Sequence, residues 1–271
     1  MSLRLDTAYY DLGRLDLLAE KKSPIHRLDP RAKVLTTLVF IVYVVSFDKY
    51  EIAGLLPFFF YPAFLVGLAD VPFGYLLRKL ILVSPFVLFI GIFNPILDRE
   101  IVFQFGSLDI SGGWLSLISI MLRFTLTVGA ALLLIATTGF PAICMALVKL
   151  GVPRVFAVQL LMLYRYVFVL IEECIRMIRA YTLRSFSKKM MPFHVFKQLL
   201  GNLLLRTLDK AQRIHMAMLS RAFTGDIHIV RQFSFGMGEI LYLVSFTLIF
   251  TVLRFYNITD LIGKFILGIG R

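Results

Sequence analysis

Two stretches of sequence, RMIRAYTLRSF at 176–186 and RIHMAMLSRAF at 213–223, end two long helical patterns in nearly the same way. Aligned, both read Arg, an apolar residue, two free positions, Ala, three free positions, Arg, a small residue and Phe. The second arginine of each stretch, Arg184 or Arg221, offers a charged fork of five donors to the carboxylates or carbonyls of a partner. Two copies of one docking end predict a partner with two copies of one socket, such as a homodimer or a heterodimer of related subunits.

Each of these arginines also has a simpler interpretation. A cation in the last turn of a helix stabilises the negative end of the helix dipole, and many helices end in Lys or Arg for that reason alone. The duplicated pattern, with its matching Ala and Phe, favours docking over this local role. The residues by themselves leave both roles open.

The composition of the whole chain is that of a membrane protein. Of its 271 residues, 59% are hydrophobic and only 17% are charged, and the mean hydropathy is +0.82. Soluble domains are about 45–50% apolar and about 25% charged. The net charge of +12 is first a matter of topology, because Lys and Arg stay on the cytoplasmic side of a membrane. No nucleic-acid motif is visible, and the polar segment 1–33 does not read as a cleavable signal peptide.

Five apolar segments predict about five transmembrane helices. They lie approximately at 34–47, 52–69, 80–97, 114–138 and 235–256. Asp29 as N-cap and Pro30 at the first helical position predict where the first of these helices begins. Four prolines are expected to bend or break the helices that contain them; they are Pro57, Pro62, Pro85 and Pro95.

The distribution of Lys and Arg divides the chain into four parts. We predict a cytoplasmic N-terminal segment at 1–33, transmembrane helices 1–4 at 34–138, cytoplasmic amphipathic helices at 139–231, and the last transmembrane helix with a tail at 232–271. Eleven basic residues between 174 and 231 are opposed only by Asp209 and Asp226, which places this stretch inside. Segment 155–171 is apolar enough to cross the membrane. Because a crossing there would carry the basic block outside, we predict a long interfacial or protein-buried helix instead.

The two long helices of this cytoplasmic region have distinct faces. On the first, which runs from 153 towards 184, four charged residues fall within about 60° of one another; they are Arg165, Glu172, Arg176 and Arg179. Glu172 precedes Arg176 by four residues, the favourable order for an ion pair, and we expect the four residues to stiffen the helix. The second helix, about 194–223, carries an apolar and a polar stripe, so it can lie between membrane-side helices and a polar partner. A solvated helix on lipid headgroups is the alternative.

The sequence lacks the usual residues of a catalytic or nucleotide-binding site. No Gly-rich loop ends in Gly-Lys-Ser/Thr, and the four histidines form no cluster with one another or with cysteine. Cys144 and Cys174 predict neither a disulfide nor a metal site. We therefore predict no cofactor, no resident metal and no enzymatic activity. A membrane-embedded enzyme acting on lipid phosphates is an alternative from another class, but no acidic pair or His cluster supplies its site.

Four stretches resemble the transmembrane T component of energy-coupling factor (ECF) transporters, and most of all the cobalt-transport Q subunits, the CbiQ family. They are HRLDPRAK at 26–33, LGVP at 150–153, LYRYVFVLIEE at 163–173 and the two arginine ends. The short signature of that family is Ala-Arg-Gly or a close variant. Here it reads Leu183-Arg184-Ser185 and Ser220-Arg221-Ala222, with both arginines present and neither glycine.

The resemblance implies an all-α, L-shaped, multi-pass protein of the bacterial or archaeal cell (inner) membrane with long cytoplasmic coupling helices. Two ATP-binding cassette ATPase subunits would bind these helices, one at each arginine end. A separate substrate-binding membrane protein, a CbiM-like S component, would contact the T component and be reoriented by ATPase closure. The implied function is a non-catalytic scaffold and force transmitter for uptake of Co²⁺ or Ni²⁺. A T component for a vitamin is the alternative, against which only the cobalt-like stretch 164–173 argues.

Overall fold

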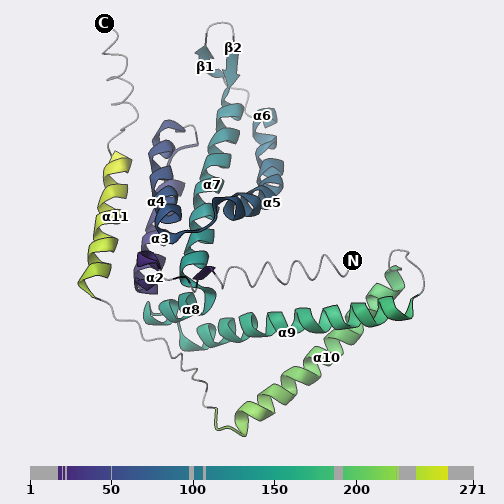
Figure 1. Ribbon diagram of the computed structural model, residues 1–271. Helices are drawn as coiled ribbons and strands as arrows, with labels where there is room; N and C mark the ends of the chain where they lie inside the picture. The colour runs from purple at the N-terminus through teal and green to yellow at the C-terminus, as the bar shows by residue number, and fades with distance from the viewer. Residues whose placement is uncertain are drawn as a thin grey trace, which may run out of the picture. The chain divides into compact units, whose positions relative to one another are not determined.

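The computed structural model describes residues 18–19, 21, 23–49, 51–97, 101–105, 108–185, 192–223, 225 and 236–255. Their elements fall into two compact units, which Figure 1 shows with the element labels used below. The first unit, here called the bundle, spans 17–139 and 233–271. The second, here called the arm, contains residues 140–232 and the first 16 residues.

The bundle is built around α7 (Gly112–Thr138), which packs against α3, α4, α5 and α6. The other bundle helices are α2 (Pro24–Arg27), α3 (Pro30–Val45), the 3-10 helix η1 (Ala53–Phe59), α4 (Phe60–Ala69), α5 (Phe73–Gly91), α6 (Phe93–Leu97) and α11 (Met237–Phe255). Before α7, β1 (Ile101–Phe105) and β2 (Leu108–Ser111) form an antiparallel hairpin in which Phe105 lies opposite Leu108. The sequence predicted only a loop at this point.

α3 begins where the sequence predicts the start of the first transmembrane helix. The Asp29 carboxylate accepts a hydrogen bond from the Arg31 backbone N–H at 2.8 Å, and Pro30 is the first helical residue. This arrangement satisfies one of the free N–H groups at the helix start, and proline has no N–H to lose there. From this start α3 packs against α7 and α11.

The core of the bundle is aromatic. The Phe40 ring of α3 lies 4.7 Å from Tyr61 of α4 and 5.3 Å from Phe250 of α11, measured between ring centroids. Phe58 of η1 stacks on Phe250, and Phe246 of α11 meets Tyr61 edge-on. All five side chains are buried. Offset and edge-on ring pairs each add about 0.5–1.5 kcal/mol beyond simple burial, so this cluster fastens α11 to α3, η1 and α4.

The prolines change helix type in some places and are accommodated in others. The second apolar segment is split into η1, which contains Pro57, and α4, in which Pro62 lies in the first turn. A proline is tolerated in a first turn because the N–H that it lacks would have no partner there. α5 continues through Pro85 to Gly91, and the chain then turns into the short α6 with Pro95.

Among the described residues, four helices are long and apolar enough to cross a membrane by length and composition: 73–95, 112–138, 154–184 and 237–255. The predicted class, an all-α polytopic membrane protein, is thus confirmed. α3 has 16 residues, fewer than the ~20 that a bilayer core requires. Helix 154–184 is one of these four helices by length and composition. The basic residues that follow it predict that it does not cross the membrane, and that topology remains a prediction.

The arm consists of α8 (Phe140–Lys149), α9 (Arg154–Arg184) and α10 (Phe193–Leu219). The LGVP stretch turns α8 into α9. Gly151 has a φ of +106°, and the Val152 N–H bonds the Leu147 carbonyl at 3.0 Å, which closes α8 with a glycine in the left-handed region. Pro153 then caps the start of α9. The Phe140 and Tyr164 rings stack 4.6 Å apart and hold α8 on α9.

Candidate functional site

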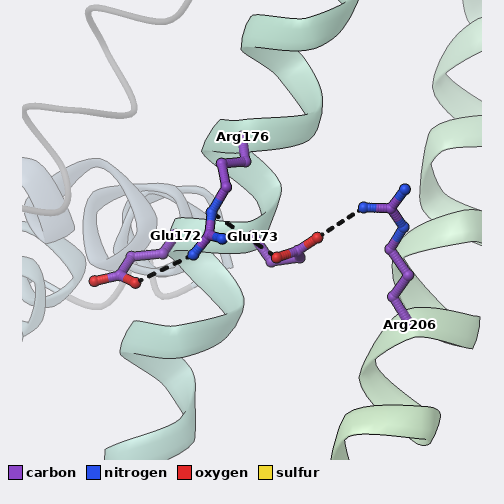
Figure 2. Close-up of polar contacts among 4 residues, drawn as sticks. All are labelled: Glu172, Glu173, Arg176 and Arg206. Atoms are coloured by element: carbon purple, nitrogen blue, oxygen red, sulfur yellow. Dashed lines mark hydrogen bonds and ion pairs between the residues drawn. The ribbon is translucent and has the colours of Figure 1, made fainter.

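A small polar cluster joins the two long helices of the arm. Arg206 on α10 donates to the Glu173 carboxylate on α9 at 2.9 Å. Arg176, one turn further along α9, lies 4.0 Å from Glu173 and 3.8 Å from Glu172 (Figure 2). The side chain of Glu173 is only 17% exposed, against 63% for Arg206. Glu173 is therefore the centre of the cluster, with a guanidinium group on each side of it.

The sequence prediction found part of this cluster. The ion pair between Glu172 and Arg176 is present as the spacing predicts. Arg165 lies exposed on α9 two turns before Glu172, outside the cluster. Arg179 is also exposed and follows Arg176 by about one turn. Glu173 was missed as a contact residue, although it directly follows Glu172. A cross-helix pair cannot be read from one helix, because it depends on which faces of two helices meet.

A groove of about 520 Å³ lies between α9 and α10 beyond this cluster. Arg176, Arg184 and Arg206 border it, and Glu173 is the one acidic residue among its lining side chains. Arg176 is paired with Glu172 as well as Glu173, so three guanidinium groups stand against two carboxylates and the groove keeps a net positive charge. It is therefore suited to carboxylates of a partner, which arginine binds through two parallel hydrogen bonds.

The first arginine end closes α9 without a special backbone conformation. Arg184 is the last helical residue, and the Ser185 N–H bonds the Tyr181 carbonyl at 2.9 Å. Ser185 is extended, with φ −97° and ψ 106°. The Leu183 side chain is 83% exposed, and Arg184 is also exposed. This end thus presents a cation and an uncovered apolar side chain side by side.

The second arginine end closes α10 differently. Ala222 has a φ of +56°, in the left-handed region, and its N–H bonds the Leu219 carbonyl at 3.0 Å. The Phe223 N–H bonds the Met218 carbonyl at 3.1 Å. This pair of bonds is the helix ending at which glycine is favoured. The family signature has glycine at the position of Ala222, and glycine adopts this left-handed backbone conformation without the strain that a side chain brings. Ser220 and Arg221 are exposed beside it.

Comparison with known proteins shows which family the sequence belongs to. Residues 21–232 match the family described as Cobalt transport protein, CbiQ. This chain belongs to the CbiQ family. It is 28% identical over 218 residues to the energy-coupling factor transporter transmembrane protein EcfT of Bacillus subtilis, covering 75% of this chain and 82% of that protein. It is 26% identical to EcfT of Thermosediminibacter oceani, covering 75% and 81%. Cobalt transport protein CbiQ of Salmonella typhimurium is 28% identical over 109 residues, 40% of this chain and 48% of that protein.

Membership in the CbiQ family confirms the resemblance seen in the sequence. The chain is the transmembrane component of an ECF-type transporter and a multi-pass protein of the cell membrane. The match to the CbiQ family includes the whole of α8, α9 and α10. The arm is therefore part of what defines the family and is not an addition to it.

In this CbiQ-family chain, α10 exposes apolar surface along its length. None of its 27 residues is buried. Its large exposed apolar side chains include Phe193, Leu200, Leu204, Leu205, Leu208 and Met216. Within the described part of the chain, α9 offers the only ion-paired contact to α10, through Glu173. A helix that is apolar and uncovered on this scale marks a protein or membrane interaction surface.

Proposed function

We propose that this chain is the scaffold and coupling subunit of an ATP-driven uptake complex for Co²⁺ or Ni²⁺. In this complex it transmits the movement of two ATP-binding cassette ATPases to a separate substrate-binding membrane protein. The observation that carries the proposal is the pair of exposed arginines, Arg184 and Arg221, each at the C-terminal end of a long arm helix. The chain itself is not catalytic in this proposal.

The arm has the chemistry that such docking needs. Each end offers an exposed guanidinium next to a small residue, Ser185 or Ala222, so a partner surface can approach the backbone closely. Leu183 and Ser220 precede the two arginines and complete the proposed coupling residues. Glu173 and Arg206 tie the two helices together, so the two docking ends are mechanically connected. Arg165, Glu172, Arg176 and Arg179 are proposed to stiffen α9.

The metal is the substrate of the proposed complex and is bound by its substrate-binding partner. Among the described residues, no group of three or more His, Cys, Asp or Glu side chains is placed to hold a metal ion. The family description and the cobalt-like stretch 164–173 support Co²⁺ or Ni²⁺. A vitamin is the second candidate substrate, because only the cobalt-like stretch 164–173 of the sequence argues against it.

Co-purification and transport test this proposal. The chain is expressed with the ATPase and membrane proteins encoded beside its gene, purified through a tag on this chain, and reconstituted into vesicles. We expect two ATPase subunits per chain and ATP-dependent uptake of Co²⁺ or Ni²⁺, with no uptake when a non-hydrolysable ATP analogue replaces ATP. Uptake of a vitamin but neither metal would favour the second candidate. A chain that purifies without an ATPase would contradict the proposal.

The cytoplasmic location of the arm is tested separately. A variant without Cys144 and Cys174 receives one cysteine at Asn202, which is exposed on α10. In intact cells a membrane-impermeant thiol reagent is expected to leave this cysteine unlabelled, and to label it once the cells are opened. Labelling in intact cells would show that 154–184 crosses the membrane and that the arm lies outside.

A further inference from the structure

A side chain from the first turn of α3, that of Lys33, holds the C-terminal end of α7. The last carbonyl groups of a helix have no partner within it. Here the Gly139 N–H, at a φ of +79°, bonds the Ile135 carbonyl at 2.8 Å. The Lys33 ammonium donates to the Thr137 carbonyl at 3.0 Å. Two of the last carbonyls are thus satisfied, one of them by a side chain 104 residues away in the sequence.

Lys33 and His26 are buried, each only 3% exposed. A buried ammonium is costly unless its charge is compensated. The end of α7 contributes to that compensation, because the C-terminus of a helix carries about half a negative charge. The charge of Lys33 and the dipole of α7 therefore stabilise each other. Separating them would take the Lys33 donor away from the Thr137 carbonyl inside the protein.

His26 is fixed on both of its ring nitrogens. Ser23 Oγ lies 2.7 Å from Nδ1, and the Leu18 carbonyl oxygen lies 3.0 Å from Nε2. A carbonyl can only accept, so Nε2 carries the proton and Nδ1 accepts from the serine hydroxyl. This is the neutral imidazole with both positions used. The ring thereby ties the chain at Leu18 and Ser23 to α2.

A second lysine, Lys21 in the segment before α2, provides a comparison. Lys21 Nζ donates to the Asp70 carbonyl at 2.8 Å, at the end of α4. Its chemistry is that of Lys33, a cation on a helix C-terminus, but the contact is exposed and lies on a different helix. α4 does not lead into the arm. Lys21 is therefore a matched control for Lys33.

We propose that Lys33 is a positioning residue that clamps the end of α7 and makes it the point through which the arm moves the bundle. Gly139 is the last residue of the bundle before the arm, and α8 begins at the next residue, Phe140. Along the chain, the arm is therefore joined directly to α7 at this glycine. An unclamped last turn would fray and absorb motion of the arm, because helix ends open at low cost. The clamp makes the last turn of α7 and the first turn of α3 move together. This inference rests on the proposed coupling function.

The test uses the whole complex in vesicles and measures Co²⁺ or Ni²⁺ uptake per ATP hydrolysed. Lys33→Met removes the ammonium but keeps a long side chain, Lys33→Arg retains the cation, and Lys21→Met is the control. We expect Lys33→Met to retain its ATPase subunits and their hydrolysis while uptake per ATP falls on the order of 5- to 150-fold, the usual range of coupling between sites. Lys33→Arg should restore most of the ratio, and Lys21→Met should leave it unchanged.

A purely structural role would lower the amount of folded complex and leave uptake per ATP as it was. An unchanged ratio in Lys33→Met, or an equal fall in Lys21→Met, would overturn the inference. Should Lys33→Met fail to assemble, insertion of two glycines between Gly139 and Phe140 tests whether motion passes through the end of α7. The insertion leaves the Lys33 contact intact and loosens the connection between α7 and the arm, so uptake per ATP should fall. An unchanged ratio would overturn the inference. A native complex without ATPases would contradict the proposed function, and this inference with it.

Discussion

The Glu173 carboxylate of α9 lies 2.9 Å from the Arg206 guanidinium of α10, and this contact is the ion pair that joins the two arm helices in the described part of the chain. Arg206 is 63% exposed, so solvent screens the pair. We expect a double-mutant cycle of Glu173→Gln and Arg206→Gln to give a coupling energy of about 0.2–1 kcal/mol in thermal unfolding, and less at high salt. Glu172→Gln is the control, since its ion pair lies within α9 and should not couple to Arg206.

The two arginine ends predict a graded loss of ATPase binding. Arg184→Ala or Arg221→Ala should each weaken ATPase association, because truncating one partner of a buried charged contact costs about 2–5 kcal/mol. The double variant also loses the avidity between the two contacts, worth roughly 10²–10⁴-fold. We expect it to insert normally, lose the ATPases on purification and abolish uptake. Affinity purification with ATPase content and metal uptake measured on the same samples checks this.

Lysine substitution separates docking from local compensation of the helix dipole. If Arg184 and Arg221 dock through a planar fork, Lys should rescue poorly, because it retains the charge but loses the paired donors. If they act only on their own helix ends, Lys should replace them with losses of about 0.3–1 kcal/mol per site. Full retention of the ATPases in the double alanine variant would refute the docking role.

The left-handed Ala222 predicts a stabilising substitution. Residues other than glycine pay roughly 1–2 kcal/mol in that region, and glycine loses about 0.5–1 kcal/mol of this gain to its greater freedom when unfolded. Ala222→Gly should therefore raise the stability of the α10 end by up to about 1 kcal/mol. Ser185→Gly should bring no gain, because Ser185 is extended. Hydrogen exchange of the amides at 219–223 measures the difference, and slower exchange is expected only for Ala222→Gly.

His26 predicts loss of stability in mild acid. Burial lowers the pKa of its imidazole below the ordinary 6.5, the hydrogen bond to the Leu18 carbonyl opposes this, and the charges of Lys33 and Lys21 lower the pKa further. Between the folded pKa and 6.5 the unfolded chain therefore binds more protons than the folded chain. The contribution of neutral His26 to the free energy of unfolding is fully present above pH 6.5 and is lost as the pH drops below that value. Thermal unfolding in detergent from pH 8 to pH 5 should show this fall, and His26→Gln should flatten it. An equal slope in both proteins would contradict the assignment to His26.

Several features of the fold follow from local sequence. Asp29 and Pro30 start α3 as predicted, since capping depends on a few adjacent residues. The β1–β2 hairpin was missed although its sequence, IVFQF-GS-LDIS at 101–111, alternates apolar residues around a Gly-Ser pair, which is a recognised hairpin pattern. Its position among apolar spans suggested a loop instead.

Other features could not be predicted because they depend on contacts between distant elements. Glu173 and Arg206 meet only because of the way α9 and α10 cross. The buried contact of Lys33 with Thr137 depends on the packing of α3 against α7 and cannot be read from either segment of sequence alone. The two arginine ends have one sequence pattern but different backbones, extended at Ser185 and left-handed at Ala222. A pattern without glycine does not specify which of the two conformations is adopted.

The uncovered α10 has a consequence for how a cell must produce this protein. A copy without partners carries a helix of 27 residues, none of them buried, with leucine and phenylalanine side chains in the open. Such a surface is recognised by chaperones and proteases and promotes aggregation. We expect surplus copies to be degraded and the surviving amount to follow the supply of partner subunits. The ratio of this chain to its partner subunits would then be kept by the rapid degradation of copies whose α10 remains uncovered.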